Sequence, residues 1–159
     1  TIVICASLGS EYLLKPLGHT FPLEPILGQA LELKFNSQNI NWSKWPAVLI
    51  SQGINLIPNE KNQILMGATC EPGVDSNPKD LRQMQSINST APEWLKDSFI
   101  IQQWKGVRGK PINRPAPILE NLEPGLIIAI GHYRNGVLLA PASAKWVAKE
   151  ISKDNKNKY

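Results

Sequence analysis

Cysteine is scarce in this sequence, which contains only Cys5 and Cys70 among its 159 residues. Two cysteines so far apart along the chain are too few for a disulfide framework or a zinc site, so we expect reduced thiols and no bound metal. The sequence also lacks any run of about 18 apolar residues and any charged-then-apolar leader, which argues against a membrane span and a signal peptide. We therefore expect a soluble, cytoplasmic protein without a membrane partner.

A basic stripe interleaved with aromatic residues is absent as well. The formal net charge is +4, but lysines gather in the terminal "KEISKDNKNKY", a composition typical of a solvated tail. Nucleic acid is therefore not an expected partner. The chain does have 42% hydrophobic residues, five Trp and thirteen Pro, which indicate a globular fold rich in sheet and stiff turns.

Several apolar runs predict a largely antiparallel sheet. "AVLIS" and "INLIP" flank Gly53 as a hairpin, and "NQILMGAT" follows as a third strand. Further strands are predicted at "TIVICA", at "PILGQALELKF" with a bend at Gly28, at "FIIQQWKGVRG" and at "LIIAIG". The Pro-rich "KPINRPAPI" is predicted to be a loop.

Two helices are predicted before the last strand. "SEYLLKPLG" predicts a short helix that is stopped by Pro16 and Gly18. Asn77 before Pro78 predicts a capping side chain followed by proline at the first helical position. This second helix is expected to continue until Pro92, with a buried stripe formed by Leu81, Met84 and Ile87.

The last helix follows the strand "LIIAIG". Because proline is tolerated only in the first turn of a helix, Pro141 predicts a start at residues 138–140. Lys145, Lys149 and Glu150 should then point outward. One apolar face is expected to hold Val137, Ala140, Ala144, Val147, Ala148 and Ile151.

Four polar or amphipathic residues, "HYRN" at 132–135, stand between Gly131 and Gly136, where the predicted strand gives way to the helix. Unpaired amides and the helix dipole attract negative charge at such a position, and α/β sheets bind ligands in crevices of this kind. The alternative is that these side chains only cap and cover the turn. Spacing alone leaves both interpretations open.

The segment "GHYRNGVLLAPASA" resembles the C-terminal signature of the FAD-dependent amine oxidases of the D-amino acid oxidase superfamily. "IVICASLGS", "PILGQ", "INLIPNEKNQILMGATCEPG" and "WKGVR" resemble further segments of the same superfamily, in the same order. Together they cover nearly the whole chain. Within the superfamily, the sequence is most similar to the glycine oxidases of thiamine biosynthesis.

The resemblance implies roles for particular residues. Arg108, in "WKGVR", matches the arginine that binds the substrate carboxylate, for which a planar guanidinium is well suited; the alternative for it is a surface salt bridge. Arg134 matches a second active-site arginine. FAD contacts are implied for His132, Tyr133, Arg134, Asn135, Gly136, Val137 and Leu138.

The flavin chemistry of the superfamily accounts for these positions. Hydride transfer leaves negative charge on the flavin, which amides at a helix N-terminus would stabilise. Gly131 and Gly136 would let the backbone approach a flat ring.

The resemblance also implies an α+β fold in three parts. Residues 1–18 would be a strand and loop of a split, Rossmann-like FAD-binding domain, and residues 19–107 a substrate-binding domain with a mainly antiparallel or mixed sheet. Residues 108–159 would return to the FAD-binding domain with its last strand and C-terminal helix. The family's G-x-G-x-x-G fingerprint is absent from the chain.

We therefore expect the C-terminal half of a longer enzyme, inactive by itself, with an N-terminal flavin-binding half as its partner. That half would supply most of the FAD contacts. Exposed strand edges where it would pair make a homo-oligomer a further expectation.

Some residues depart from the family pattern. Asn55 stands where glycine oxidases have a Tyr that lines the substrate pocket, and Cys70 stands where they have a Met. Other departures near the proposed cofactor or in the Pro-rich loop are Ser7, Gly9, Asn113 and Leu119. These changes count against glycine as the substrate.

Functions of different classes remain open. The first is an FAD-dependent oxidase that takes a hydride from a small amino acid or amine and passes the electrons to O2, giving H2O2. The second is a non-catalytic carboxylate-binding module without its own flavin, which the missing fingerprint motivates. A third, an anion-binding protein using Arg108 and Arg134, predicts binding without turnover.

Overall fold

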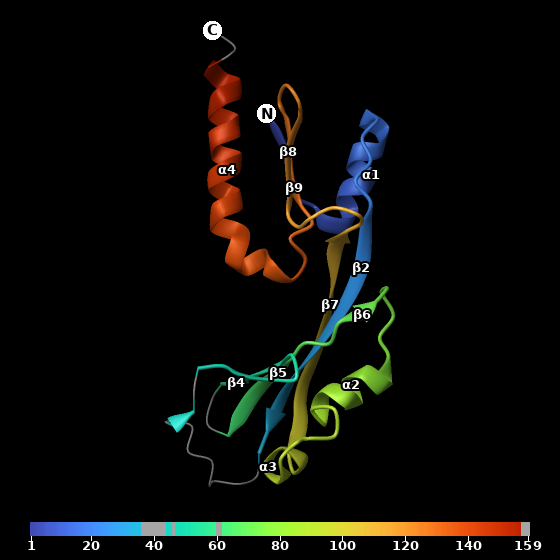
Figure 1. Cartoon of the computed structure of the whole chain (residues 1–159), viewed down its shortest axis with the longest axis vertical. Helices are drawn as coiled ribbons and strands as arrows, with labels where there is room; N and C mark the ends of the chain where they lie inside the picture. The colour runs from blue at the N-terminus through green and yellow to red at the C-terminus, as the bar shows by residue number, and fades with distance from the viewer. Residues whose placement is uncertain (36–43, 46, 60–61, 157–159) are drawn as a thin grey trace. The chain divides into compact units, whose positions relative to one another are not determined.

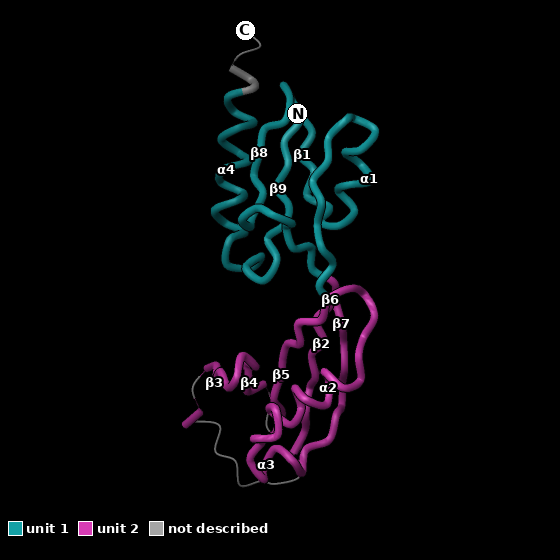
Figure 2. The backbone as a smooth tube through the Cα atoms, turned by 45° about the vertical axis from the view of Figure 1, so that its right-hand side comes forward, with its two compact units in different colours: residues 1–26, 108–159 teal, residues 27–107 magenta. Residues whose placement is uncertain are grey.

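A computed structural model describes residues 1–35, 44–45, 47–59 and 62–156, with backbone only for 154–156. The chain divides into two compact units, shown in different colours in Figure 2: unit 1 is Thr1–Ile26 with Arg108–Tyr159, and unit 2 is Leu27–Val107. Helices combine with mixed and antiparallel sheets, so the predicted α+β class is confirmed.

Unit 1 contains a three-stranded sheet in the order β1–β9–β8 (Figure 1). β1 (Ile2–Ile4) pairs in parallel with β9 (Leu126–Ile130), and β8 (Ile118–Glu123) pairs antiparallel with β9. Every residue of β9 is buried, as expected of an uninterrupted apolar run in a central strand. The strand predicted at "LIIAIG" is confirmed. β8 was not predicted; its first residue, Ile118, was included in the predicted loop "KPINRPAPI".

A short helical segment covers part of this sheet. α1 (Ser10–Leu14) places Leu14 in a core with Phe21, Ile118 and Ile128. The helix predicted here is confirmed, and it ends before Pro16 as expected. Pro16 lies in the first turn of a 3-10 segment, Lys15–Leu17, where proline needs no amide partner. The chain turns at Gly18, which has a left-handed conformation with φ 81°.

The last helix, α4 (Gly136–Lys156), follows a 3-10 turn at Tyr133–Asn135. The start predicted at residues 138–140 is wrong, since Pro141 lies inside the helix rather than in its first turn. The preceding 3-10 turn starts helical winding early, so the chain accepts one missing internal hydrogen bond at Pro141.

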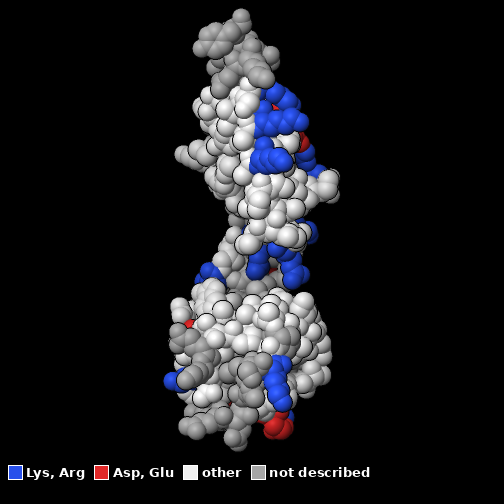
Figure 3. Space-filling view, turned by 90° about the vertical axis from the view of Figure 1, so that its left-hand side faces the viewer, with Lys and Arg blue, Asp and Glu red and all other residues white. Residues whose placement is uncertain are grey.

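The apolar face predicted for α4 is only partly covered. Val137 is 95% exposed, and Ser143 is the one buried side chain of α4 among those described. A sheet of three strands is too narrow to cover the whole face. Lys145 and Lys149 are exposed as predicted, and lysine and arginine side chains form a group on the α4 side of unit 1 in Figure 3.

The second sheet has β2 (Leu23–Lys34) at its centre, and most of it belongs to unit 2. The predicted hairpin and third strand are confirmed as an antiparallel meander. The strands predicted around "PILGQALELKF" and "FIIQQWKGVRG" are confirmed as β2 and β7. The sheet order is β3–β4–β5–β2–β6, with β7 also pairing with β2, and the bounds are β3 (Leu49–Ser51), β4 (Ile54–Pro58), β5 (Gln63–Gly67), β6 (Glu71–Pro72) and β7 (Phe99–Pro111).

The core of unit 2 lies between one face of this sheet and two helices, α2 (Pro78–Gln85) and α3 (Glu93–Lys96). Asn77 caps α2 as predicted, its side chain accepting a hydrogen bond from the Lys79 amide at 2.9 Å. The helix ends at Gln85 and not at Pro92. Ile87 is buried as predicted. Its φ of 46° is not helical, so it lies in a turn after α2, and its side chain reaches the core from that turn.

Cys5 and Cys70 are both exposed, and neither forms a disulfide within the described residues. Within the described residues, none of the helices has the length and apolarity needed to span a bilayer.

Candidate functional site

A cavity of about 480 Å³ lies in unit 1, beside the C-terminal ends of β1 and β9. Parallel strands that end side by side leave such a crevice, because their connecting chains diverge there. Four parts of the chain line it: β1 with the segment after it, β9 with the strand-to-helix turn after it, one side of α4, and Arg108 on β7. The lining residues are Val3, Cys5, Ser7, Arg108, Ala129, Ile130, Gly131, His132, Tyr133, Gly136, Ala140, Ser143, Ala144 and Val147.

The turn after β9 has an unusual backbone. Gly131 and Tyr133 have φ values of 66° and 53°, and Ser7 on another wall of the cavity has φ 50°. Left-handed conformations cost energy for residues with a Cβ and are often found at functional sites. A Cβ at Gly131 would lie 2.8 Å from Pro111 Cγ, so glycine is required here by the fold itself.

A substitution tests this requirement. Gly131→Ala is expected to lower the free energy of unfolding by about 1–3 kcal/mol, because it adds a left-handed alanine and a clash. Gly136→Ala is the matched control, since Gly136 has a helical φ of −54° and an added Cβ would meet only His132 Cβ at 3.8 Å. Urea unfolding should show the control unchanged or slightly stabilised. Equal losses in both variants would contradict the explanation.

His132 is half-buried in this turn, and its Nε2 lies 2.8 Å from the hydroxyl Oγ of Ser143 on α4. Ser143 is 7% exposed and lines the cavity. No role for Ser143 was predicted from the sequence. Its position could have indicated one, because Ser143 stands three residues after Ala140 and four before Val147, in the middle of the expected apolar face of the helix.

Arg108 lies at the end of β7, half-buried, and lines the cavity. Among the described residues it forms no ion pair, so the structure shows no salt bridge of the kind considered as its alternative role. The next residue, Gly109, lies close to Ser7: a Cβ there would be 2.9 Å from Ser7 Oγ. This close approach brings the Arg108 end of β7 against the segment that follows β1.

Only some of the other site residues predicted from the sequence line this cavity. Tyr133 and Gly136 line the cavity together with Arg108 and His132. Arg134, Asn135, Val137 and Leu138 do not line it; they are exposed, Leu138 by 78%. Asn55 and Cys70 belong to unit 2: Asn55 is half-buried on β4, opposite Gly67, and Cys70 is exposed after β5.

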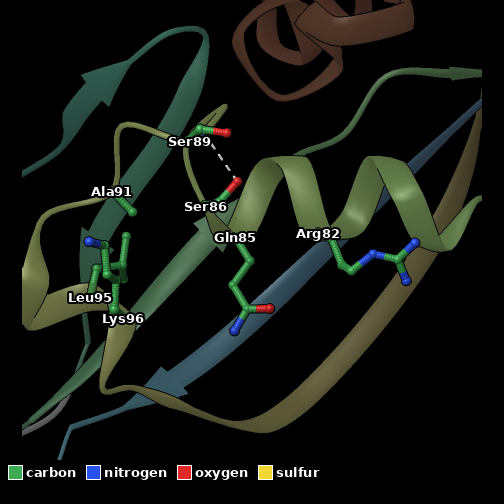
Figure 4. A pocket seen from close by; sticks show the side chains of 7 residues that line it. All are labelled: Arg82, Gln85, Ser86, Ser89, Ala91, Leu95 and Lys96. Carbon is green, nitrogen blue, oxygen red and sulfur yellow. Dashed lines mark hydrogen bonds between the residues drawn. The ribbon is translucent and has the colours of Figure 1, made fainter.

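Unit 2 contains a second, smaller cavity of about 330 Å³ between α2 and α3 (Figure 4). Its serines bond within their own turn: Ser86 Oγ accepts a hydrogen bond from the Ser89 amide and donates one to the Gln83 carbonyl. Lys96 pairs with Glu93, and Arg82 extends away from the two serines. We interpret this cavity as a groove left by helix packing.

Unit 2 also buries one carboxylate, that of Glu71, which is 3% exposed. Gln29 Nε2 donates to its Oε1 at 2.8 Å, the Thr69 hydroxyl donates to the same oxygen, and the Asn77 amide donates to Oε2 at 2.8 Å. Burial alone would raise the pKa of Glu71, but these hydrogen bonds and the charge of Lys105 outweigh it and hold the pKa below its ordinary value of 4.5. Glu71 is therefore ionised at neutral pH.

The family model described as "DAO: FAD dependent oxidoreductase" matches residues 1–150. The chain therefore belongs to this family of FAD-dependent oxidoreductases. Among curated relatives, the glycine oxidase of Pseudomonas aeruginosa is 34% identical over 160 residues, covering 95% of this chain and 41% of that protein. The family predicted from the sequence is thus confirmed, and the chain spans about two fifths of the length of this relative.

Solved structures of the same kind share the fold. Glycine oxidase from Bacillus cereus superposes with a TM-score of 0.78 at 25% identity, covering 96% of this chain and 42% of that one. Iminodiacetate oxidase from Chelativorans gives a TM-score of 0.80 at 22% identity, with the same coverage. The α+β fold that the resemblance implied is therefore confirmed.

Proposed function

We propose that this chain is part of an FAD-dependent oxidoreductase that oxidatively deaminates a small amino acid or amine, in the manner of a glycine oxidase. The observation that carries the proposal is the cavity of unit 1, which is lined by Arg108 and by Gly131, His132, Tyr133 and Gly136 of the strand-to-helix turn. A fixed cation and a helix N-terminus are the groups needed by a substrate carboxylate and by a cofactor that gains negative charge.

The chemistry of the cavity fits part of an FAD molecule. Apolar side chains such as Val3, Ala129 and Val147 offer a surface for a flat aromatic ring. At Gly136 the backbone is open to close approach, since an added Cβ would meet only one atom within 4 Å. We propose that FAD is contacted by residues 132–138, of which Tyr133 and Gly136 line the cavity.

FAD, when bound, would take a hydride from the substrate and pass the electrons to O2. Arg108 would hold the substrate carboxylate with two parallel hydrogen bonds and so orient the carbon that is oxidised. Arg134, exposed on the turn, would add positive charge. His132 is not assigned as a general base, because its Nε2 is engaged with Ser143.

In this proposal residues 1–18 and 108–159 belong to the flavin domain and residues 19–107 to the substrate domain. Asn55 and Cys70 would line the substrate pocket. Since they stand where glycine oxidases have a Tyr and a Met, we propose a substrate that differs from glycine in size or polarity. A separate flavin-binding half and a second copy of the chain are proposed partners.

A second candidate is a carboxylate-binding module without redox activity. One observation favours it: Arg108 lines the cavity, half-buried, and forms no ion pair among the described residues. It would use Arg108 to bind an anion and would carry no visible chromophore.

The visible spectrum of the purified protein, recorded before and after addition of FAD and removal of excess, separates the two candidates. Flavin absorbance that stays with the protein, followed by peroxide release from glycine, sarcosine or a D-amino acid, would support the oxidase. Carboxylate binding without retained flavin, also in the presence of a flavin-binding partner chain, would favour the module.

A further inference from the structure

Ser143 and His132 form a hydrogen bond across the cavity wall that the proposed catalytic roles do not use. Serine inside a helix can bond to the carbonyl four residues earlier. Ser152, on the same helix, does so, with its Oγ 2.9 Å from the Ala148 carbonyl. Ser143 instead reaches the imidazole of a residue eleven positions earlier.

The direction of this hydrogen bond follows from counting partners. A buried hydroxyl must donate its hydrogen somewhere, and His132 is the one hydrogen-bond partner of Ser143 in the described part of the chain. Donation of this hydrogen to Nε2 would satisfy the hydroxyl within the protein. A neutral imidazole that accepts at Nε2 carries its hydrogen at Nδ1.

We propose that Ser143 is a positioning residue that holds His132 as a neutral imidazole with its hydrogen on Nδ1. His132 lines the cavity, and in the described part of the chain its Nδ1 has no hydrogen-bond partner, so this N–H is a donor that a ligand there could use. It suits an electron-rich acceptor, such as a carbonyl of the flavin ring or a substrate carboxylate. The role toward a ligand rests on the proposed function, whereas the tautomer does not.

The tautomer is measured by NMR of the histidine rings, through two-bond correlations between ring nitrogens and carbon-bound hydrogens. The chain contains only two histidines, so His19→Gln assigns the His132 signals. In the purified protein above the pH of histidine titration, Nδ1 should give the shift of a protonated nitrogen and Nε2 that of an unprotonated one. The reverse pattern would overturn the proposal.

Three variants separate positioning from folding. Ser143→Ala should convert the ring to a mixture of tautomers, Ser143→Thr should restore the wild-type pattern, and Ser152→Ala should leave it unchanged. Thermal unfolding identifies a variant that fails to fold, in which case Ser143→Thr still tests the role of the hydroxyl. If His132 kept the same tautomer in a folded Ser143→Ala protein, the proposal would be wrong.

The second readout is FAD affinity by absorbance titration, where Ser143→Ala should weaken binding about fivefold, the value of one neutral hydrogen bond. A protein that shows the expected tautomer but retains no FAD, also in the presence of a flavin-binding partner chain, would contradict the proposed oxidase and leave Ser143 as the residue that sets the state of His132. If wild type binds FAD and Ser143→Ala binds it equally well, the His132 N–H has no role toward the flavin.

Discussion

Replacing Arg108 by alanine is expected to lower kcat/KM for an amino acid substrate by about 100-fold or more, because the substrate carboxylate would enter the cavity without its charged partner. Arg108→Lys should recover only part of this loss, since an ammonium group does not form the two parallel hydrogen bonds of a guanidinium. The measurement is peroxide release by the chain combined with its flavin-binding half and loaded with FAD, over a range of substrate concentrations.

A substrate without a carboxylate tests whether Arg108 acts on the carboxylate itself. A primary amine that lacks a carboxylate should be oxidised by wild type and the Arg108→Ala variant at similar, low rates. Arg82→Ala serves as the control for loss of an arginine, because Arg82 lies in unit 2 on the groove between α2 and α3. If the variant lost activity equally toward the amino acid and the amine, Arg108 would not be the carboxylate-binding residue.

Replacing Glu71 by alanine is expected to lower the free energy of unfolding by about 3 kcal/mol, because three donors in a buried site would lose their acceptor. Glu71→Gln should also destabilise, since its amide would turn a donor toward those donors. The control is Glu93→Ala, which removes an exposed ion pair with Lys96 and should cost less than about 1 kcal/mol. Urea unfolding at neutral pH measures all three.

The pH dependence of the Glu71 effect has a definite sign. The pKa of Glu71 in the folded protein lies below its ordinary value of 4.5, so its carboxylate contributes stability that is fully present above that value. The contribution is lost as the pH falls through the lowered folded pKa. Wild type and Glu71→Ala should therefore differ most near neutral pH and converge in acid. A difference that stayed constant down to about pH 3 would mean that the charge contributes nothing.

Local chemistry in the sequence was enough to predict several elements. Asn77 and Pro78 placed the start of α2, because a capping side chain and a proline act on the amides next to them. Gly53 placed the hairpin, and the uninterrupted apolar run of β9 identified a central strand. The family could also be recognised from short motifs in their order, and the match over residues 1–150 confirms it.

The arrangement of the candidate site required the tertiary structure. Of the residues selected from the sequence, Arg108, His132, Tyr133 and Gly136 come together at one cavity, whereas Arg134 is exposed outside its lining. Adjacent residues in a turn face different directions, and a sequence motif does not record which of them faces the cavity.

The sequence by itself determined the family, the strand and helix signals, and the residue types available for a carboxylate and a flavin. Only the tertiary structure decided where α2 ends, where α4 begins, which arginine lines the cavity, and that Ser143 bonds to His132. The physical reason is the distance along the chain over which each interaction acts. Caps and turns act on neighbouring residues. Burial of Ile87 and the bond between residues 132 and 143 depend on chain segments that meet only when the protein folds.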